Sequence, residues 1–254
     1  MSDRTDLRVG VAGLGTVGAG TVKLLQDDPA KLAQRASRKL TITAVSARDR
    51  GRDRGLDLAD CRWSDDPLEL ARAEDVDVVV ELIGGSDGIA LELTRQALAN
   101  GKSVVTANKA MLAHHGAELA ALAEAHGGVL AFEAAVAGGI PIVKSLREGL
   151  AGDRVTRVFG IMNGTCNYIL SVMAETGREF ADVLSEAQTL GYAEADPGFD
   201  IDGIDAAHKL ALLAAIAFGG RPRFDAIHID GIRHISAVDI EFAAELGYRI
   251  KLLG

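Results

Sequence analysis

The sequence predicts an α/β fold, a doubly wound parallel sheet followed by a second α+β unit that is incomplete. Up to about residue 136, short apolar segments alternate with helical segments, which is typical of parallel strands joined by right-handed crossover helices. A glycine-rich segment follows the first apolar segment directly. The alternation stops after Ala137-Gly138-Gly139, so we expect one domain over residues 1–138 and another over residues 139–254.

Each element of the first domain has its own signal. Residues 76–83 form a nearly continuous apolar run, as expected for a strand covered on both faces. Asn100-Gly101 and Gly127-Gly128 are typical helix ends. We expect strands at 7–12, 40–47, 76–83, 104–105 and 129–136, and helices at 17–26, 88–99 and 112–125.

The second domain reads as mainly helical. We expect helices at 141–149, 165–175, 181–190 and 239–246, with a further apolar helix beyond Gly203. A strand is expected at 155–162, and another begins after residue 247 and is cut off at Gly254.

Composition excludes several classes of protein. The chain has 254 residues, of which 48% are hydrophobic, and its net charge of −9 argues against a general nucleic-acid binder. Cys61 and Cys166 are far apart and form no metal-binding pair, which fits a reducing compartment. The first ten residues contain no signal peptide, and the longest apolar run, 210–218, is too short to span a bilayer. We therefore expect a cytoplasmic protein without membrane contacts.

Gly13, Gly15 and Gly18 form a GxGxxG motif between a strand and a helix, the context that dinucleotide binding requires. The first glycine permits a tight turn, the second lets a pyrophosphate approach the backbone, and the third allows close packing. The helix that opens at Thr16-Val17 offers its N–H groups to phosphate. The alternative is a loop with glycines for conformational reasons alone. The motif in this context predicts a Rossmann-type nucleotide site.

The end of the second strand bears on which nucleotide binds. An acidic residue here would favour NAD, but the chain reads Ser46-Ala47-Arg48. Between Arg35 and Arg54 there are seven basic and two acidic side chains. Because arginine can hold a 2′-phosphate, NADP is favoured, with NAD still possible. The alternative is a solvated basic loop.

An acidic segment leads into the apolar helix of the second domain. It carries Glu194, Asp196, Asp200, Asp202 and Asp205 and ends at Lys209, which stands one helical turn after Asp205. Carboxylates around a lysine suit an amino-acid substrate, since one can hold an ammonium group while the lysine moves a proton. The alternative is an acidic helix start with a surface ion pair.

Three further segments carry candidate groups. Thr106-Ala107-Asn108-Lys109 follows a strand, where Lys109 could meet a nicotinamide or a substrate carboxylate. Glu133 lies inside the expected strand 129–136, where a carboxylate needs a partner or a cation. Asn163-Gly164-Thr165 joins a strand to a helix, as a substrate-binding loop or an ordinary N-cap.

With these motifs in order, the whole chain resembles the homoserine dehydrogenase family. The resemblance rests on GLGTVG, TANK, FEAAVAGGIPI, NGTCNYIL and GYAEADPGFDIDGIDAAHK. It implies an NAD(P)-dependent oxidoreductase that interconverts L-homoserine and L-aspartate 4-semialdehyde, a step toward threonine, methionine and isoleucine. Members usually continue well beyond this length, so the resemblance also implies a truncated, split or partial chain.

The resemblance also assigns roles. The catalytic lysine falls on Lys209, with Lys109 near the nicotinamide. The substrate-binding set is Glu194, Asp200, Asp205, Tyr192, Thr165 and Gly164. The cofactor-binding set is Gly13, Gly15, Thr16, Val17, Gly18, Arg48, Thr106, Lys109, Gly191 and Glu194.

A monovalent cation, Na⁺ or K⁺, and a homodimer are implied in the same way. The cation would lie on the backbone carbonyls of Glu133, Val136, Gly138 and Ile140. Direct hydride transfer is the expected chemistry, with Lys209 exchanging the hydroxyl proton and Asp205 orienting it. The competing interpretations are a nucleotide-binding fragment without activity and a related small-aldehyde reductase.

Overall fold

The computed structural model describes residues 6–254; the first five residues, part of the segment in which we expect no signal peptide, lie outside the described residues. The chain divides into two compact units, one ending at Lys144 and the other spanning Ser145–Gly254. This division lies a short way beyond the boundary predicted after residue 138.

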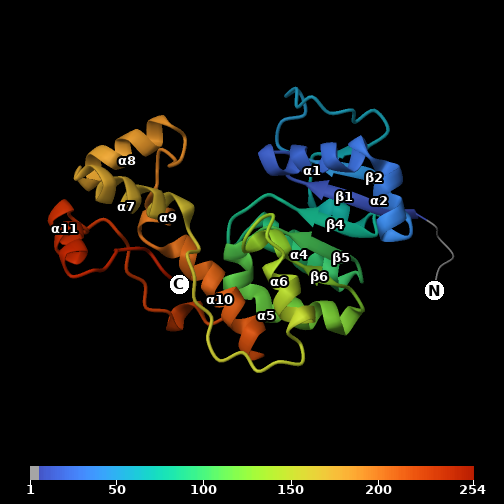
Figure 1. Ribbon diagram of the computed structural model, residues 1–254. Helices are drawn as coiled ribbons and strands as arrows, with labels where there is room; N and C mark the ends of the chain where they lie inside the picture. The colour runs from blue at the N-terminus through green and yellow to red at the C-terminus, as the bar shows by residue number, and fades with distance from the viewer. Residues whose placement is uncertain (1–5) are drawn as a thin grey trace. The chain divides into compact units, whose positions relative to one another are not determined.

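The first unit is built on a six-stranded parallel sheet (Figure 1). Its strands are β1 (Asp6–Ala12), β2 (Lys39–Ser46), β3 (Arg62–Ser64), β4 (Val78–Glu81), β5 (Ser103–Thr106) and β6 (Leu130–Ala131). The spatial order is β3-β2-β1-β4-β5-β6, so the chain starts in the middle of the sheet and builds outward in both directions. The predicted α/β, Rossmann-type doubly wound fold is confirmed.

The helices of this unit cover both faces of the sheet. They are α1 (Thr16–Asp27), α2 (Pro29–Ala36), α3 (Leu68–Arg72), α4 (Ile89–Ala99) and α5 (Lys109–His126). Helix α1 packs with α2, and α3, α4 and α5 pack in a row. Right-handed crossovers place these two groups on opposite faces. Val11, Val45, Val79 and Val104 are fully buried between them.

The strand predicted over 129–136 is wrong beyond its first residues. Strand β6 pairs with β5 only at Leu130 and Ala131, after which the chain turns through the 3₁₀ helix η1 (Glu133–Ala135). Glu133 is therefore half-buried in a turn instead of lying inside a strand. Its carboxylate accepts hydrogen bonds from Val143 N at 2.8 Å and Lys144 N at 2.9 Å. The carboxylate thus stabilises the short helix α6 (Ile142–Lys144), part of the expected helix 141–149.

The second unit is helical over its described residues. Its elements are the π-helix η2 (Ser145–Gly149), α7 (Gly164–Thr176), α8 (Phe180–Thr189), α9 (Gly198–Ile201), α10 (Ile204–Phe218), the 3₁₀ helix η3 (Phe224–Ala226) and α11 (Ala237–Glu245). Buried Ile169, Leu170 and Met173 of α7 pack with Val183 of α8 and Ile201 of α9. This core fixes the loops that carry the polar residues described below.

The two strands expected in this unit, at 155–162 and after 247, are wrong as strands. Both segments run without regular secondary structure, joined by two backbone hydrogen bonds of 3.0 Å between Gly160 and Gly254. Asn167 holds Leu252 through both of its amide atoms, at 3.0 and 3.1 Å. A side-chain amide here supplies the pairing that a neighbouring strand gives in a sheet, so no continuous ladder forms.

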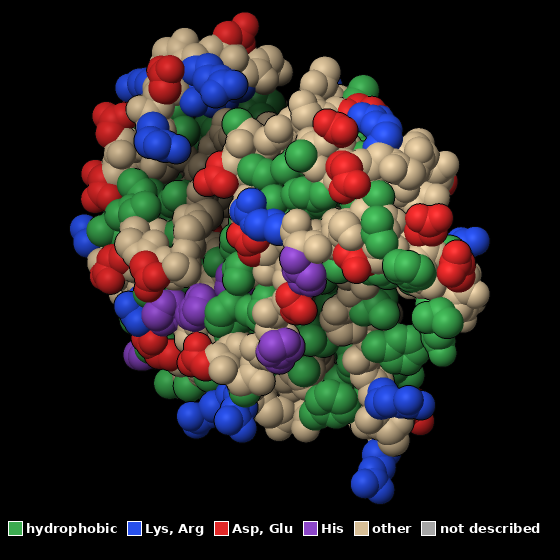
Figure 2. All heavy atoms as spheres, turned by 90° about the vertical axis from the view of Figure 1, so that its left-hand side faces the viewer, with side chains coloured by type: hydrophobic (Ala, Val, Ile, Leu, Met, Phe, Trp, Pro, Cys, Tyr) green, Lys and Arg blue, Asp and Glu red, His purple; other side chains and the backbone are tan. Residues whose placement is uncertain are grey.

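Surface charge is mixed. On the face that Figure 2 shows, basic and acidic side chains are interspersed with hydrophobic ones, without one broad basic patch. None of the helices within residues 6–254 has the length and hydrophobicity needed to cross a membrane.

Candidate functional site

The carboxyl ends of three neighbouring strands bring the candidate groups of the first unit to one edge of the sheet. Ala12 of β1 stands in register with Glu81 of β4, which stands in register with Thr106 of β5. The glycine-rich turn follows Ala12 directly, and Lys109 opens α5 shortly after Thr106. This edge lies at the point where the strand order reverses, between β1 and β4, the usual ligand position in open α/β sheets.

The glycine-rich turn can be built only from glycine at two of its three positions. Gly13 has φ +95° and donates its N–H to Ser46 O at 2.8 Å. A Cβ on Gly13 would lie 2.4 Å from Leu82 O, and one on Gly18 would lie 1.8 Å from Gly13 O. Both glycines are thus required for close packing.

Gly15 differs, because a Cβ there would meet nothing within 4 Å. It faces open space beside exposed Thr16 and Val17 and is the N-cap of α1, which has no side-chain cap. The N–H groups of this first turn have no intrahelical partner and can bind a phosphate. The turn therefore fits the pyrophosphate of a dinucleotide.

The buried carboxylate of Glu81 connects the ends of β4 and β5 at this edge of the sheet. Glu81 is fully buried, and its Oε2 accepts a hydrogen bond of 2.6 Å from Thr106 Oγ1. Its Oε1 accepts from Ile83 N at 2.8 Å and Gly84 N at 3.2 Å. Asn108 N donates to Thr106 Oγ1 at 2.9 Å, and Asn108 Nδ2 donates to Gly85 O at 2.7 Å. The loops after β4 and β5 are thus fixed to each other immediately before Lys109.

A basic loop follows β2 and borders a hollow. Arg48, Arg50 and Arg52 are exposed, whereas Arg54 is half-buried and donates from Nε to Leu14 O at 3.1 Å. The hollow has a volume of about 460 Å³, and Trp63 is among its lining residues. Exposed guanidinium groups beside a hollow of this size can hold the phosphate of a nucleotide.

In the second unit, Lys209 and Asp205 form a half-buried ion pair on α10. Lys209 Nζ donates to Asp205 Oδ2 at 2.7 Å and to Met162 O at 2.8 Å. The two side chains are 19% and 6% exposed, respectively. The i, i+4 spacing read from the sequence accounts for the pair, and the apolar face of α10 accounts for its burial.

Asn163 joins a second carboxylate to this pair. The residue is 4% exposed, and its Nδ2 donates to Asp205 Oδ2 at 2.9 Å and to Asp200 Oδ1 at 2.8 Å. Its Oδ1 accepts from Cys166 N at 2.8 Å and so caps α7. The neutral Asn163 side chain thus bonds to both acids. Its hydrogen bond offsets part of the desolvation cost of burying Asp205. We call Asp200, Asp205, Lys209 and Asn163 the carboxylate–lysine cluster.

Comparison with known proteins identifies the family. A family model for the homoserine dehydrogenase NAD-binding domain matches residues 13–133, and one for homoserine dehydrogenase matches residues 141–254. A solved structure from Archaeoglobus fulgidus, named for the same family, is 35% identical with a TM-score of 0.86, and the matched region covers 98% of this chain and 79% of that one. The chain belongs to the homoserine dehydrogenase family.

Three further homoserine dehydrogenases are similar to this chain in sequence or structure. The Neisseria gonorrhoeae enzyme is 50% identical over 98% of this chain and 57% of its own length. The Thiobacillus denitrificans structure is 49% identical with a TM-score of 0.93, over 98% of this chain and 57% of that one. A hyperthermophilic archaeal homoserine dehydrogenase solved in complex with NADPH is 28% identical, with a TM-score of 0.78 over 91% and 75%. The chain spans little more than half the length of the curated relatives it matches.

The structure brings only some of the residues predicted from the family together. Thr165 Oγ1 donates to Tyr192 O at 2.9 Å, which ties the start of α7 to the segment after α8. Gly164 and Tyr192 are exposed, and the Tyr192 ring lies 4.8 Å from the Tyr168 ring. The exposed carboxylate of Glu194 makes no hydrogen bond with the described residues of the chain, so Glu194 stands outside the carboxylate–lysine cluster.

Gly191, also assigned from the family, follows α8 with φ +77°. It is exposed, and a Cβ there would meet nothing within 4 Å. The positive φ explains the choice of glycine at this helix end without any ligand.

The cation expected in homoserine dehydrogenases would use backbone carbonyls of the loop 133–140. Glu133 O already accepts from Val136 N at 3.4 Å, and Ile140 O accepts from Ile142 N at 2.8 Å. Each carbonyl keeps a second lone pair, so these bonds are compatible with a hard cation. Gly138 is exposed with φ +59°. Among residues 6–254 no group of three or more His, Cys, Asp or Glu side chains could hold a metal. This finding concerns side-chain ligands and does not apply to backbone carbonyls.

Glu81 is a residue of this edge for which the sequence predicts no site role. It lies within an apolar run, and the acid at the end of that run is the available signal. Asn163 belongs to the predicted substrate-binding loop or N-cap, but nothing in its local sequence indicates that it bonds to two acids farther along the chain.

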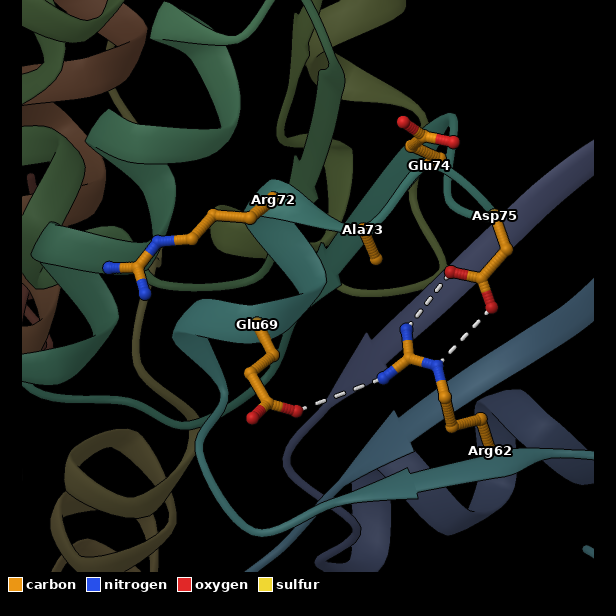
Figure 3. Close-up of a pocket in the computed structure, with 6 residues that line it drawn as sticks. All are labelled: Arg62, Glu69, Arg72, Ala73, Glu74 and Asp75. Atoms are coloured by element: carbon orange, nitrogen blue, oxygen red, sulfur yellow. Dashed lines mark hydrogen bonds and ion pairs between the residues drawn. The ribbon is translucent and has the colours of Figure 1, made fainter.

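A second hollow of about 430 Å³ lies in the first unit, lined by Arg62, Glu69, Arg72, Ala73, Glu74 and Asp75 (Figure 3). Arg62 donates to Asp75 at 2.9 and 3.3 Å and lies 3.9 Å from Glu69. The hydrogen bond from Arg62 holds the pKa of Asp75 below its usual range. The charge of Arg62 is therefore balanced by the carboxylates of Asp75 and Glu69 in a surface ion-pair network.

Proposed function

We propose that this chain carries the dehydrogenase chemistry of its family, the interconversion of L-homoserine and L-aspartate 4-semialdehyde with a nicotinamide cofactor. Family membership and the intact glycine-rich turn support the cofactor, because Gly15 and the uncapped start of α1 leave room for a pyrophosphate. The observation that carries the proposal is the half-buried Lys209–Asp205 pair within a cluster of acids.

In this proposal the second unit binds the substrate. Asp200 and Asp205 are negatively charged groups that can hold the substrate ammonium, and the open backbone at Gly164 lets the substrate approach the start of α7. Glu194 and Tyr192 would complete the pocket from the exposed segment after α8, and Gly191 would lie beside the cofactor. The exposed carboxylate of Glu194 is available for such a contact.

Lys209 is the proposed proton-transfer group. When bound, the nicotinamide cofactor supplies or accepts the hydride. In the oxidising direction, the substrate hydroxyl gives its proton to the Lys209 amine, or to a water that Lys209 orders, as its carbon loses hydride, and the aldehyde forms. In the reducing direction the Lys209 ammonium returns that proton. Asp205, one helical turn away, orients the amine through its 2.7 Å hydrogen bond.

We propose NADP as the preferred cofactor. Arg48 and its neighbours are exposed after β2, where an acid would otherwise bind a ribose hydroxyl, and these guanidinium groups suit a 2′-phosphate. The relative solved with NADPH shows that this form binds to a member of the family. Thr106 and Lys109, at the carboxyl edge of β5, are the proposed contacts near the nicotinamide.

A monovalent cation on the carbonyls of Glu133, Val136, Gly138 and Ile140, and a homodimer, complete the proposal. Neither bears on the assignment of Lys209. Light scattering would test the dimer, and a thermal shift on replacing Na⁺ or K⁺ by a bulky organic cation would test the cation.

The proposal is tested by NADPH oxidation with L-aspartate 4-semialdehyde beside an NADPH fluorescence titration. Turnover that requires this substrate supports it. Binding of NADPH without turnover would instead support a nucleotide-binding fragment. Equal rates with unrelated small aldehydes would support a less specific reductase.

A further inference from the structure

The guanidinium of Arg54 donates hydrogen bonds to the backbone carbonyls of three residues. Its Nε donates to Leu14 O at 3.1 Å, its Nη1 to Arg52 O at 2.7 Å, and its Nη2 to Asp49 O at 2.7 Å. Two of these carbonyls belong to the basic loop, and the third lies between Gly13 and Gly15 in the glycine-rich turn. Arg54 thus hydrogen-bonds the loop after β2 directly to that turn.

Only arginine suits this position. A guanidinium presents five N–H donors in a rigid, planar fork, whereas a lysine ammonium is a single flexible point with three donors. Arg54 is half-buried, unlike its exposed neighbours Arg48, Arg50 and Arg52. Its Cζ also lies 5.8 Å from the centre of the Trp63 ring, within the range of a cation–π contact.

The rest of the loop is shaped by local turns that Arg54 holds in place. Asp49 Oδ1 accepts from Gly51 N at 2.9 Å and Arg52 N at 3.2 Å, and Asp53 Oδ1 accepts from Gly55 N at 2.8 Å. These bonds fix short stretches of the loop but do not connect it to the nucleotide site. The bond from Arg54 to Leu14 O provides that connection.

We infer that Arg54 is a positioning residue for cofactor selection: it holds the basic loop against the glycine-rich turn so that Arg48, Arg50 and Arg52 face a 2′-phosphate. Three of its five N–H donors are engaged with backbone carbonyls, which fixes its guanidinium as part of the loop. The inference rests on the proposed cofactor function and adds the device that couples the pyrophosphate site to the selectivity loop.

The test compares Arg54→Lys with Arg38→Lys, which makes the same change on an exposed side chain that precedes β2 and lies outside the loop. Trp63 is the only tryptophan of the chain and its Nε1 donates to Asp65 Oδ1 at 2.9 Å, so its fluorescence reports on the loop that covers it. Two readouts are needed: acrylamide quenching of Trp63 without cofactor, and the affinities for NADPH and NADH by titration. Gln26 still holds the loop at Asp57 O in both variants, and circular dichroism checks their fold.

We expect Arg54→Lys to increase Trp63 quenching and to reduce the preference for NADPH over NADH about tenfold, while Arg38→Lys leaves both quantities unchanged. A reduced preference with unchanged quenching would make Arg54 a direct phosphate ligand and overturn the inference. If quenching increased while the cofactor preference stayed unchanged, the role of Arg54 would be structural only. If neither quantity changed, Arg54 would have no role in positioning the loop. A wild-type chain that binds neither nucleotide would instead overturn the proposed cofactor function.

Discussion

Lys209 Nζ and Asp205 Oδ2 lie 2.7 Å apart on one face of α10, in a site that leaves the carboxylate only 6% exposed. The pair is held further by Asn163, which donates to the same Oδ2 atom at 2.9 Å. A lysine fixed in this way has few orientations available, and proton transfer depends on such fixed geometry. The pair therefore links the local helical spacing to the proposed chemistry.

Asp205→Asn should reduce turnover by about 10²-fold, because the amide keeps the shape but removes the charge that orients Lys209. NADPH affinity should be unchanged, since the nucleotide motifs belong to the first unit. Asp202→Asn is the matched control, since Asp202 is a half-buried acid of the same segment that pairs with Arg233 outside the cluster. Steady-state kinetics on both variants checks this, and equal losses would show a general effect of charge.

Gly18→Ala should lower the free energy of unfolding by about 1–3 kcal/mol and weaken NADPH binding, because the new Cβ would lie 1.8 Å from Gly13 O. Gly20→Ala, two residues along the same helix, should stabilise by about 0.5–1 kcal/mol, since a Cβ there meets nothing within 4 Å. Urea unfolding followed by Trp63 fluorescence reports on this unit. Similar stability for the two variants would show that the turn is looser than described.

Arg48→Ala should weaken NADPH binding about tenfold and leave NADH binding unchanged, because only NADPH carries the 2′-phosphate. Arg38→Ala is the control, since Arg38 belongs to the same basic region but precedes β2, whereas Arg48 follows it. Fluorescence titrations with both nucleotides measure the effect. An equal loss for NADH would mean that Arg48 does not read the phosphate.

The buried thiol of Cys166 gives a pH prediction. Burial raises its pKa to about 12, so the folded state keeps the proton above pH 9, where an exposed thiol loses it. Stability from this group is therefore fully present below the unfolded pKa and is lost as pH rises toward 12. Melting temperatures between pH 8 and about pH 11 should fall less steeply for Cys166→Ala than for wild type. Parallel slopes would contradict the burial of this thiol.

The first unit could be largely predicted because its signals are local. The glycine spacing, the apolar runs of β1, β2 and β4, and the glycines that end α4 and α5 each act within a few residues. Strand β3 and helix α3 were not predicted, because Arg62–Ser64 and Leu68–Arg72 are too short and polar to show a period. Their place depends on pairing with β2 and packing on α4, which are not local.

The candidate site was predictable only in part, for the same physical reason. The i, i+4 pair of Asp205 and Lys209 follows from helical spacing alone. The reach of Asn163 to Asp200 and Asp205 depends on packing of α7 against α9, and no pattern near residue 163 encodes it. The strand expected at 155–162 was wrong because an apolar run forms a strand only where partners complete a ladder.

The most direct measurement is the initial rate of NADPH oxidation with L-aspartate 4-semialdehyde, for the wild-type chain and for Lys209→Met. We expect wild type to turn over and the rate of Lys209→Met to fall by at least about 10²-fold, while this variant binds NADPH with unchanged affinity. Equal rates for the two proteins would contradict the assignment of Lys209 as the proton-transfer group.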